Sequence, residues 1–143
     1  MLIGISPLIS PDLLALLHRM GHGDELVLAD AHFPGESIGQ RLLRADGLRI
    51  APLLDGILPL LALDAYVEHP VMMMAVVPGD TADSTVETSY RAVIDKYWPQ
   101  TPPIQRLERF AFYERAGTAF AVVMTGETAK YGNIILKKGV TPV

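Results

Sequence analysis

The chain has no cysteine, a single tryptophan and no cluster of basic residues, and its 143 residues carry a formal net charge of −4. Without cysteine there are no disulfides and no thiolate metal ligands, a pattern that fits a reducing compartment. Proteins that bind nucleic acid concentrate Lys and Arg on one surface. We therefore do not expect nucleic acid as a partner.

Long hydrophobic runs are also missing. No apolar stretch approaches the roughly 20 residues of a membrane-spanning helix, and residues 1–7 lack the basic start and extended apolar core of a signal peptide. We therefore expect no membrane partner and a cytoplasmic location. Half of the residues are hydrophobic and a fifth are charged, which at this length predicts one domain spanning residues 1–143.

The motifs of nucleotide binding and serine hydrolysis are absent too. The sequence contains no Gly-rich phosphate loop, no dinucleotide-binding fingerprint and no Gly-x-Ser-x-Gly elbow. These absences argue against a nucleotide cofactor and against a serine nucleophile.

What the sequence does contain is an alternation of helical and strand patterns. Ser10-Pro11-Asp12 is typical of a helix start, and Gly21 is the expected C-cap of that helix. The apolar run Leu26–Ala29 predicts a strand buried on both faces. The alternation predicts an α/β fold built in layers. Further strands are expected at 42–43, 71–77, 104–107, 119–125 and 133–137, and further helices at 52–58, 84–97 and 110–116.

Local signals refine these boundaries. Ser84-Thr85-Val86-Glu87 has the pattern of a capping box that begins a helix, and Gly117 is expected to end the 110–116 helix. Lys137-Lys138 is expected to end an edge strand, where lysines discourage aggregation. Glu127 and Lys130 are interpreted as a solvated pair in a loop.

His22 is the strongest candidate for proton transfer. It lies between Gly21 and Gly23, just past a helix end rather than on an apolar face, and histidine gives and takes protons near neutral pH. The alternative is a histidine that interacts only with the helix dipole and the last carbonyls of the helix. Spacing alone does not separate the two interpretations.

Asp30 is the second candidate, because it follows a buried strand at its carboxyl end, where open α/β sheets place ligand-binding groups. Alternatively, Asp30 caps the turn that follows it. The eight residues from His22 to Asp30 span up to ~26 Å when extended. The two side chains can share one site only if the flanking turns curl back or if a second subunit contributes one of them.

A metal site is the weaker interpretation of the same region. Histidine residues at 18 and 22 have the i,i+4 spacing of a helical ligand pair, but Gly21 lies between them and no Glu follows His18. A catalytic zinc site needs a defined set of three ligands with supporting hydrogen bonds. We therefore expect no metal. The residues considered are His18, His22, Asp24, Asp30 and His32.

The last third of the chain carries the most specific signal. An apolar strand stops at Gly126, another restarts at Ile134, and Tyr131-Gly132-Asn133 lies between them. Tyr and Asn offer a hydroxyl and an amide, and Gly allows close approach of the backbone. Arg109 precedes an aromatic helix, where it either clamps hydroxyls or a carboxylate or is a solvated residue at a helix start. Together with 21–24 and 29–34, this pattern points to a sugar site.

Six segments taken together are distinctive: 21–25 (GHGDE), 29–34 (ADAHFP), 44–47 (RADG), 71–74 (VMMM), 109–116 (RFAFYERA) and 125–140 (TGETAKYGNIILKKGV). With these segments the chain resembles the L-fucose mutarotase family, which is related to the D-ribose pyranases, and the resemblance extends from Ile5 to Val140. D-Ribose pyranases resemble the chain only around residues 21–22, 30, 126–127 and 131–133, which favours fucose over ribose.

The resemblance implies a three-layer α/β/α domain with a mixed sheet. It also implies ring-shaped homo-oligomers, often decamers, with each site in the cleft between neighbouring subunits. By position, His22 matches the family's proton donor, Asp30 and Arg109 match sugar contacts, and Tyr131-Gly132-Asn133 matches the segment that a neighbouring subunit donates. No cofactor is implied.

Mutarotation adds a proton to the ring oxygen while another leaves the anomeric hydroxyl, so that the ring opens and recloses on the other face. His22 is the expected acid, and the base stays unassigned. Two other functions remain open from the sequence. They are a non-catalytic monosaccharide-binding module with the same pocket and a D-ribose pyranase-like enzyme. A metal-dependent sugar isomerase is a third possibility.

Overall fold

A computed structural model describes all 143 residues. It contains one six-stranded sheet and five helices. The strands are β1 (Glu25–Ala29), β2 (Leu42–Ala45), β3 (Val71–Met74), β4 (Gln105–Leu107), β5 (Ala121–Thr125) and β6 (Ile134–Lys137), and the helices are α1 (Pro11–Arg19), α2 (Gly35–Ile38), α3 (Ile50–Ile57), α4 (Ser84–Tyr97) and α5 (Arg109–Thr118). None of the helices is long and apolar enough to cross a membrane.

The sheet is mixed, with the strand order β2-β5-β1-β6-β3-β4. β1, β2 and β5 are parallel to one another, and β3 is parallel to β4. β6 joins these two groups because it runs antiparallel to both β1 and β3. The carboxyl ends of β1 and β5 therefore meet the amino end of β6 at one edge of the sheet.

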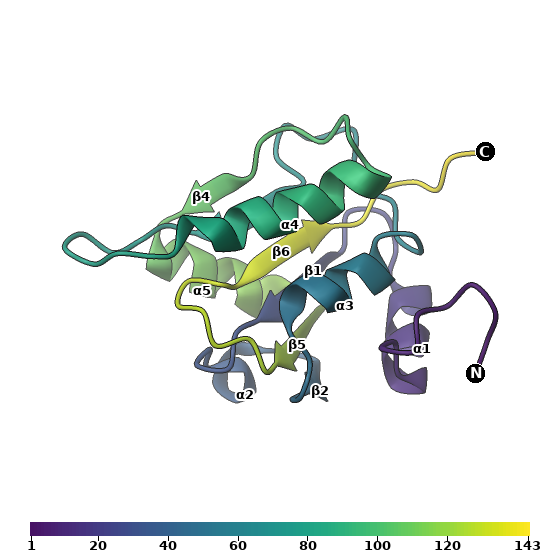
Figure 1. Cartoon of the computed structure of the whole chain (residues 1–143), viewed down its shortest axis with the longest axis horizontal. Coiled ribbons are helices and arrows are strands. Elements are labelled where there is room, and N and C mark those ends of the chain that lie inside the picture. The colour runs from purple at the N-terminus through teal and green to yellow at the C-terminus, as the bar shows by residue number, and fades with distance from the viewer.

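Helices cover both faces of the sheet, as Figure 1 shows with α3 and α4 on one side and α5 on the other. Alternate residues of β1 point to opposite faces. Leu26 and Leu28 join a core cluster with residues of α1, α3 and α4, whereas Val27 and Ala29 pack with Phe112 of α5. The predicted α/β fold, with three α/β/α layers and a mixed sheet, is confirmed.

Several local predictions are also confirmed. The Ser10 hydroxyl accepts a hydrogen bond from Leu13 N at 3.1 Å and caps α1, with Pro11 at the first helical position. β1 is buried at every position, as its apolar run predicts. The short strands expected at 42–43 and 104–107 form as β2 and β4.

The predicted edge strand is wrong. β6, which ends at Lys137, lies in the interior of the sheet, hydrogen-bonded to β1 on one side and to β3 on the other. The two lysines led to the wrong prediction because Lys137 is the last residue of the strand, where its ammonium nitrogen lies 3.8 Å from a Glu25 carboxylate oxygen. An interior strand thus ends in a charged residue without facing solvent along its length.

Four boundaries also differ from the prediction. α1 has Met20 rather than Gly21 as its C-cap, because the chain turns directly into extended backbone there. The N-cap of α4 is Asp83, whose carboxylate accepts from Thr85 N, and not Ser84. Gly117 lies inside α5, which continues to Thr118. The strand expected at 71–77 ends at Met74, since its neighbour β4 also ends there in register.

Two leucines at the C-terminal end of α3 differ in burial and so provide a test of the core packing. Leu58, at the C-cap of α3, is fully buried, whereas Leu60 is 37% exposed. Deleting a buried leucine side chain costs about 2–5 kcal/mol through lost transfer energy and the cavity left behind. We expect Leu58→Ala to lower the free energy of unfolding by about 3 kcal/mol and Leu60→Ala by less than about 1 kcal/mol, measured by urea unfolding. Equal losses in the two variants would contradict this packing.

Candidate functional site

A cavity of about 350 Å³ lies where the carboxyl ends of β1 and β3 meet the amino end of β6. The structure brings four of the sequence-predicted residues to its wall, although they come from separate segments. The residues that line it are Asp30, His32, Phe33, Met74, Val77, Arg109, Tyr113, Lys130, Tyr131 and Asn133. Its volume is within the range of small-molecule sites.

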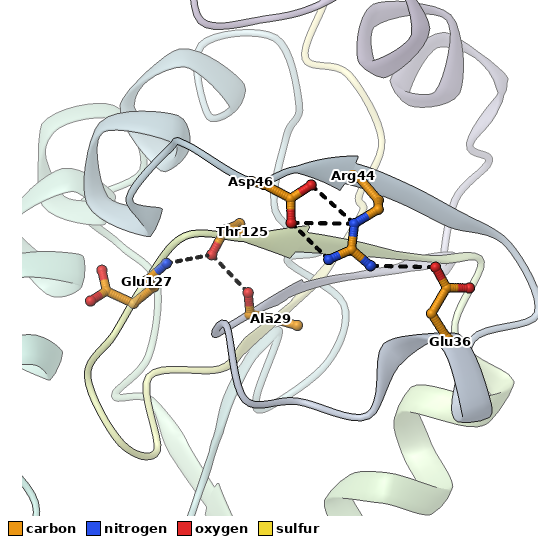
Figure 2. Close-up of polar contacts among 6 residues, drawn as sticks. All are labelled: Ala29, Glu36, Arg44, Asp46, Thr125 and Glu127. Atoms are coloured by element: carbon orange, nitrogen blue, oxygen red, sulfur yellow. Dashed lines mark hydrogen bonds and ion pairs between the residues drawn. The ribbon is translucent and has the colours of Figure 1, made fainter.

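The loop that carries Lys130, Tyr131 and Asn133 into the cavity wall begins at a hydroxyl that joins two strand ends. Thr125, the last residue of β5, donates from Oγ1 to the Ala29 carbonyl at 2.7 Å, and the same oxygen accepts from Glu127 N at 3.2 Å (Figure 2). Beside it, exposed Arg44 pairs with Asp46 and Glu36 (Figure 2). The end of β5 is thereby fastened to the end of β1, and the chain enters the 126–133 loop from a fixed point.

Asp30 and Asn133 form the polar floor of the cavity. The Asp30 backbone N–H donates to Asn133 Oδ1 at 2.7 Å, and Asp30 Oδ1 accepts from His32 N at 3.0 Å. Both residues are buried. Because Asn133 uses its oxygen here, its Nδ2 keeps two donors, and it has no protein partner within hydrogen-bond distance. Burial raises the pKa of the Asp30 carboxyl above its ordinary value, although the His32 N–H opposes this shift.

The 127–133 loop is held from behind by buried groups. The Tyr90 hydroxyl donates to the Gly132 carbonyl oxygen at 2.8 Å, and a Cβ at Gly132 would lie 2.9 Å from the Ala129 carbonyl oxygen. Only glycine fits this position. Gly132 therefore shapes the backbone without lining the cavity, whereas its neighbours Tyr131 and Asn133 present side chains to it.

Glu127 is not the solvated loop residue that the sequence suggests. It is buried, its carboxylate accepts from Arg49 Nη1 at 3.0 Å and from Ala129 N at 3.1 Å, and it lies 3.4 Å from Ile50 N at the start of α3. A carboxylate at a helix N-terminus is favourable because it meets unpaired N–H groups and the helix dipole. Glu127 thus ties the loop to α3. Lys130 is exposed as expected, but its partner is Asp80.

Arg109 forms the cationic part of the wall. It lies at the start of α5, where Nε donates to the Tyr113 hydroxyl at 3.2 Å and the guanidinium lies 5.4 Å from the ring centroids of Phe110 and Tyr113. Its Nη atoms have no protein partner. The Tyr113 hydroxyl raises the pKa of Arg109 above its ordinary value, so the cavity wall that includes Asp30 also carries a permanent positive charge.

His22 lies at the other end of β1 and does not line this cavity. β1 alone separates the two ends by roughly 16 Å at about 3.3 Å per residue. His22 Nε2 lies 3.2 Å from Asp64 Oδ1, and its ring packs at 5.5 Å from that of Tyr66. The Asp64 side chain is 2% exposed, whereas the His22 side chain is half exposed. Within one chain, the turns do not bring His22 and Asp30 together.

No group of three or more His, Cys, Asp or Glu side chains lies close enough to hold a metal ion. His18, His22, Asp24, Asp30 and His32, the residues considered for a metal site, are not gathered at one point.

The sequence analysis missed three polar residues that contact the candidate site residues His22, Tyr131 and Gly132. Asp64 contacts His22 across 42 residues of sequence, Tyr90 supports Gly132 from α4, and Asp80 contacts Tyr131 across 51 residues. No spacing in the sequence links these pairs. Asp80 follows a Pro-Gly turn and Asp64 lies between predicted elements, so neither carries a motif that would have identified it.

Comparison with known proteins places the chain in a family. Residues 3–141 match the model of the RbsD / FucU transport protein family. The chain belongs to this family. It is 62% identical over 143 residues to an L-fucose mutarotase of Actinobacillus pleuropneumoniae, covering 100% of this chain and 99% of that protein. It is 59% identical, with the same coverage, to an L-fucose mutarotase of Histophilus somni. The resemblance noted from the sequence is thereby confirmed.

Solved structures of family members have the same fold. A fucose mutarotase from Streptococcus pneumoniae in complex with L-fucose superposes with a TM-score of 0.93 at 48% identity, covering 99% of this chain and 100% of that chain. RbsD of Bacillus subtilis, complexed with D-ribose, has a TM-score of 0.69 at 22% identity, covering 94% and 95%. The latter likeness concerns the fold alone.

The raised pKa of Asp30 gives a pH-dependent test. Its ionised form is disfavoured in the folded state, so its stabilising contribution is complete below the unfolded pKa of 3.8 and is lost as pH rises through the higher folded pKa. We expect Asp30→Asn to raise the free energy of unfolding, relative to the parent, more near neutral pH than below pH 3.8. Urea unfolding at the two pH values measures this difference.

Asp46→Asn is the matched control of opposite sign. The Arg44 guanidinium lowers the pKa of Asp46, so its stabilising contribution is present above the unfolded pKa and is lost as pH falls through the lower folded pKa. This variant should lose stability near neutral pH. The same sign of change in both variants would contradict the description of Asp30.

Proposed function

We propose that this protein is an L-fucose mutarotase that interconverts the α and β anomers of L-fucose. Two relatives named L-fucose mutarotase are 62% and 59% identical over the full length, and a relative of the same fold has been crystallised with L-fucose. The observation that carries the proposal is the cavity, where Asp30, Arg109, Tyr131 and Asn133 meet. These groups supply acceptors and donors for several hydroxyls at once.

The cavity residues would bind the sugar in distinct ways. The Asp30 carboxylate accepts from sugar hydroxyls, and the free Nδ2 of Asn133 donates to a sugar oxygen. Arg109, at the start of α5, offers its unpaired Nη donors. Phe33 and Tyr113, whose rings pack edge to face at 5.6 Å, provide an apolar surface for the C–H groups of the ring. Donors and acceptors fixed on separate walls discriminate between sugars that differ in one hydroxyl.

His22 is the proposed general acid, and Asp64 is the group that orients it. When Nε2–H donates to the buried Asp64 carboxylate, Nδ1 is the nitrogen left to exchange a proton with the sugar. The carboxylate also stabilises the imidazolium that forms when the histidine takes a proton back. Positioned acid catalysis of this kind contributes about 10²- to 10⁴-fold. The complementary base stays unassigned.

A neighbouring copy of the chain would bring His22 to the cavity. The two regions lie at opposite ends of β1, and both carry exposed apolar side chains, with Tyr66 78% exposed beside His22 and Phe110 67% exposed beside Arg109. A contact between two different patches is head-to-tail, and such contacts form a ring when the rotation from one subunit to the next closes. This supports the ring-shaped homo-oligomer implied by the family, for which a decamer is the proposed size. A cytoplasmic location stays a prediction of the sequence.

Two alternatives share the same cavity. The family's description as a transport protein family favours a non-catalytic monosaccharide-binding module as the second candidate. A D-ribose pyranase-like enzyme is the other, in which the same acid opens a different ring.

Anomer exchange measured by NMR saturation transfer tests the function. We expect the protein to accelerate exchange of L-fucose anomers more than that of D-ribose, and EDTA to leave the rate unchanged. His22→Ala should reduce the acceleration by at least about 10²-fold, because the acid is lost. His18→Ala, which removes an exposed histidine of α1, is the matched control and should keep the full rate.

Other outcomes identify the alternatives. Sugar binding without accelerated exchange indicates the binding module, and faster exchange with D-ribose indicates the pyranase. Activity that is lost with EDTA and restored by a divalent ion would contradict a metal-free reaction. Near-normal exchange by His22→Ala would assign the acid to another residue.

A further inference from the structure

Asp80 contacts two residues of the cavity wall from outside the cavity. It lies in the 75–83 segment, which extends from the sheet between β3 and α4 (Figure 1). Its Oδ2 accepts from the Tyr131 hydroxyl at 2.7 Å, and its Oδ1 accepts from Lys130 Nζ at 2.8 Å and from Thr81 N at 2.8 Å. Asp80 itself does not line the cavity.

These contacts determine what Tyr131 can offer a ligand. A phenol carries one proton, and Tyr131 donates it to the carboxylate. The lone pairs of the phenol oxygen then remain for other partners, so within the cavity Tyr131 can only accept a hydrogen bond. Hydrogen bonds from Lys130, Tyr131 and Thr81 to the Asp80 carboxylate lower its pKa to about 2. The carboxylate therefore stays an acceptor at every pH at which the protein is expected to work.

The same contacts hold a strained backbone in place. Tyr131 has a φ of 60°, the only positive value among the non-glycine residues, and such a conformation persists only where the surroundings impose it. Tyr90 fixes the following carbonyl, that of Gly132, from one side, and Asp80 fixes the Tyr131 side chain from the other. Val77, on the same segment as Asp80, forms part of the cavity wall.

We propose that Asp80 is a positioning residue that fixes the Tyr131 hydroxyl as a hydrogen-bond acceptor in the sugar site. The site therefore selects a sugar that presents a hydroxyl donor, and not only a ring oxygen, to Tyr131. This inference rests on the proposed function, because it assumes that the cavity binds the sugar. Asp80 acts through Tyr131 and, by pairing with Lys130, keeps the 75–83 segment against the cavity.

A double-mutant cycle of anomer exchange tests the coupling. Asp80→Asn replaces the carboxylate with a group that can also donate to the phenol, so the Tyr131 proton is free to turn into the cavity. We expect kcat/KM to fall about tenfold, the effect of one misdirected hydrogen bond, and mainly through KM. In a Tyr131→Phe background, Asp80→Asn should lower kcat/KM by less than about twofold.

Asp83→Asn is the matched control. Asp83 belongs to the same segment and caps α4 through Thr85 N without touching the cavity, and Asn is an equally good N-cap. This variant should keep the parent kinetics. Equal losses from Asp80→Asn in both backgrounds, or no loss in the parent background, would overturn the proposal.

A second readout does not depend on catalysis. The hydrogen bond to Asp80 raises the pKa of Tyr131 above its ordinary value of 10.0, and Asp80→Asn should return it toward that value. Titration of ¹³Cζ-labelled tyrosines, with the Tyr131 signal assigned by Tyr131→Phe, measures the shift. Identical Tyr131 titrations in the parent and Asp80→Asn proteins would overturn the proposal. If the parent fails to accelerate exchange, the proposed function fails, and this titration still decides the role of Asp80.

Discussion

The hydrogen bond from Asp30 N to Asn133 Oδ1 joins residues that are 103 positions apart and holds the candidate site together. Asp30 immediately follows β1, and Asn133 immediately precedes β6, which pairs with β1. The Asn133 side chain accepts a backbone N–H that is buried at the end of the strand, where an unpaired donor would cost about 1–3 kcal/mol. The bond uses neither the Asp30 carboxyl nor the Asn133 amide nitrogen, and both residues line the cavity. One contact thus completes the sheet edge and arranges two proposed sugar ligands.

The polar groups around this bond form a supporting layer behind the cavity. Thr125 fastens β5 to β1, Glu127 ties the loop to α3, and Tyr90 holds the Gly132 carbonyl from α4. Each of these contacts pairs a buried donor or acceptor, so the loop has few alternative conformations of similar energy. A rigid loop is what a site needs if it is to distinguish hydroxyl positions on a small ring, because loosely held donors would adapt to the wrong sugar.

Local patterns in the sequence were sufficient for the elements and for part of the site. The cap at Ser10, the apolar run of β1 and the polar residues between β5 and β6 all specify short-range features, and the structure agrees with them. The interior position of β6, the burial of Glu127 and the contact between His22 and Asp64 depend on which distant segments pair. Periodicity gives the face that a strand buries but not its neighbours in the sheet. The family resemblance supplied what periodicity could not, namely a mixed sheet in a three-layer α/β/α domain.

Because His22 and Asp30 lie at opposite ends of β1, we propose that the acid and the sugar cavity of one working site come from different copies of the chain. Subunit mixing tests this claim most directly. His22→Ala lacks the acid, and Arg109→Ala, which changes an exposed residue of the cavity wall, lacks a sugar contact. When the two inactive proteins exchange subunits in equal amounts, about a quarter of head-to-tail contacts should unite an intact His22 with an intact cavity. We expect up to about that fraction of the parent anomer exchange to return. Complete subunit exchange, shown by native mass spectrometry, without recovery of activity would contradict the shared site.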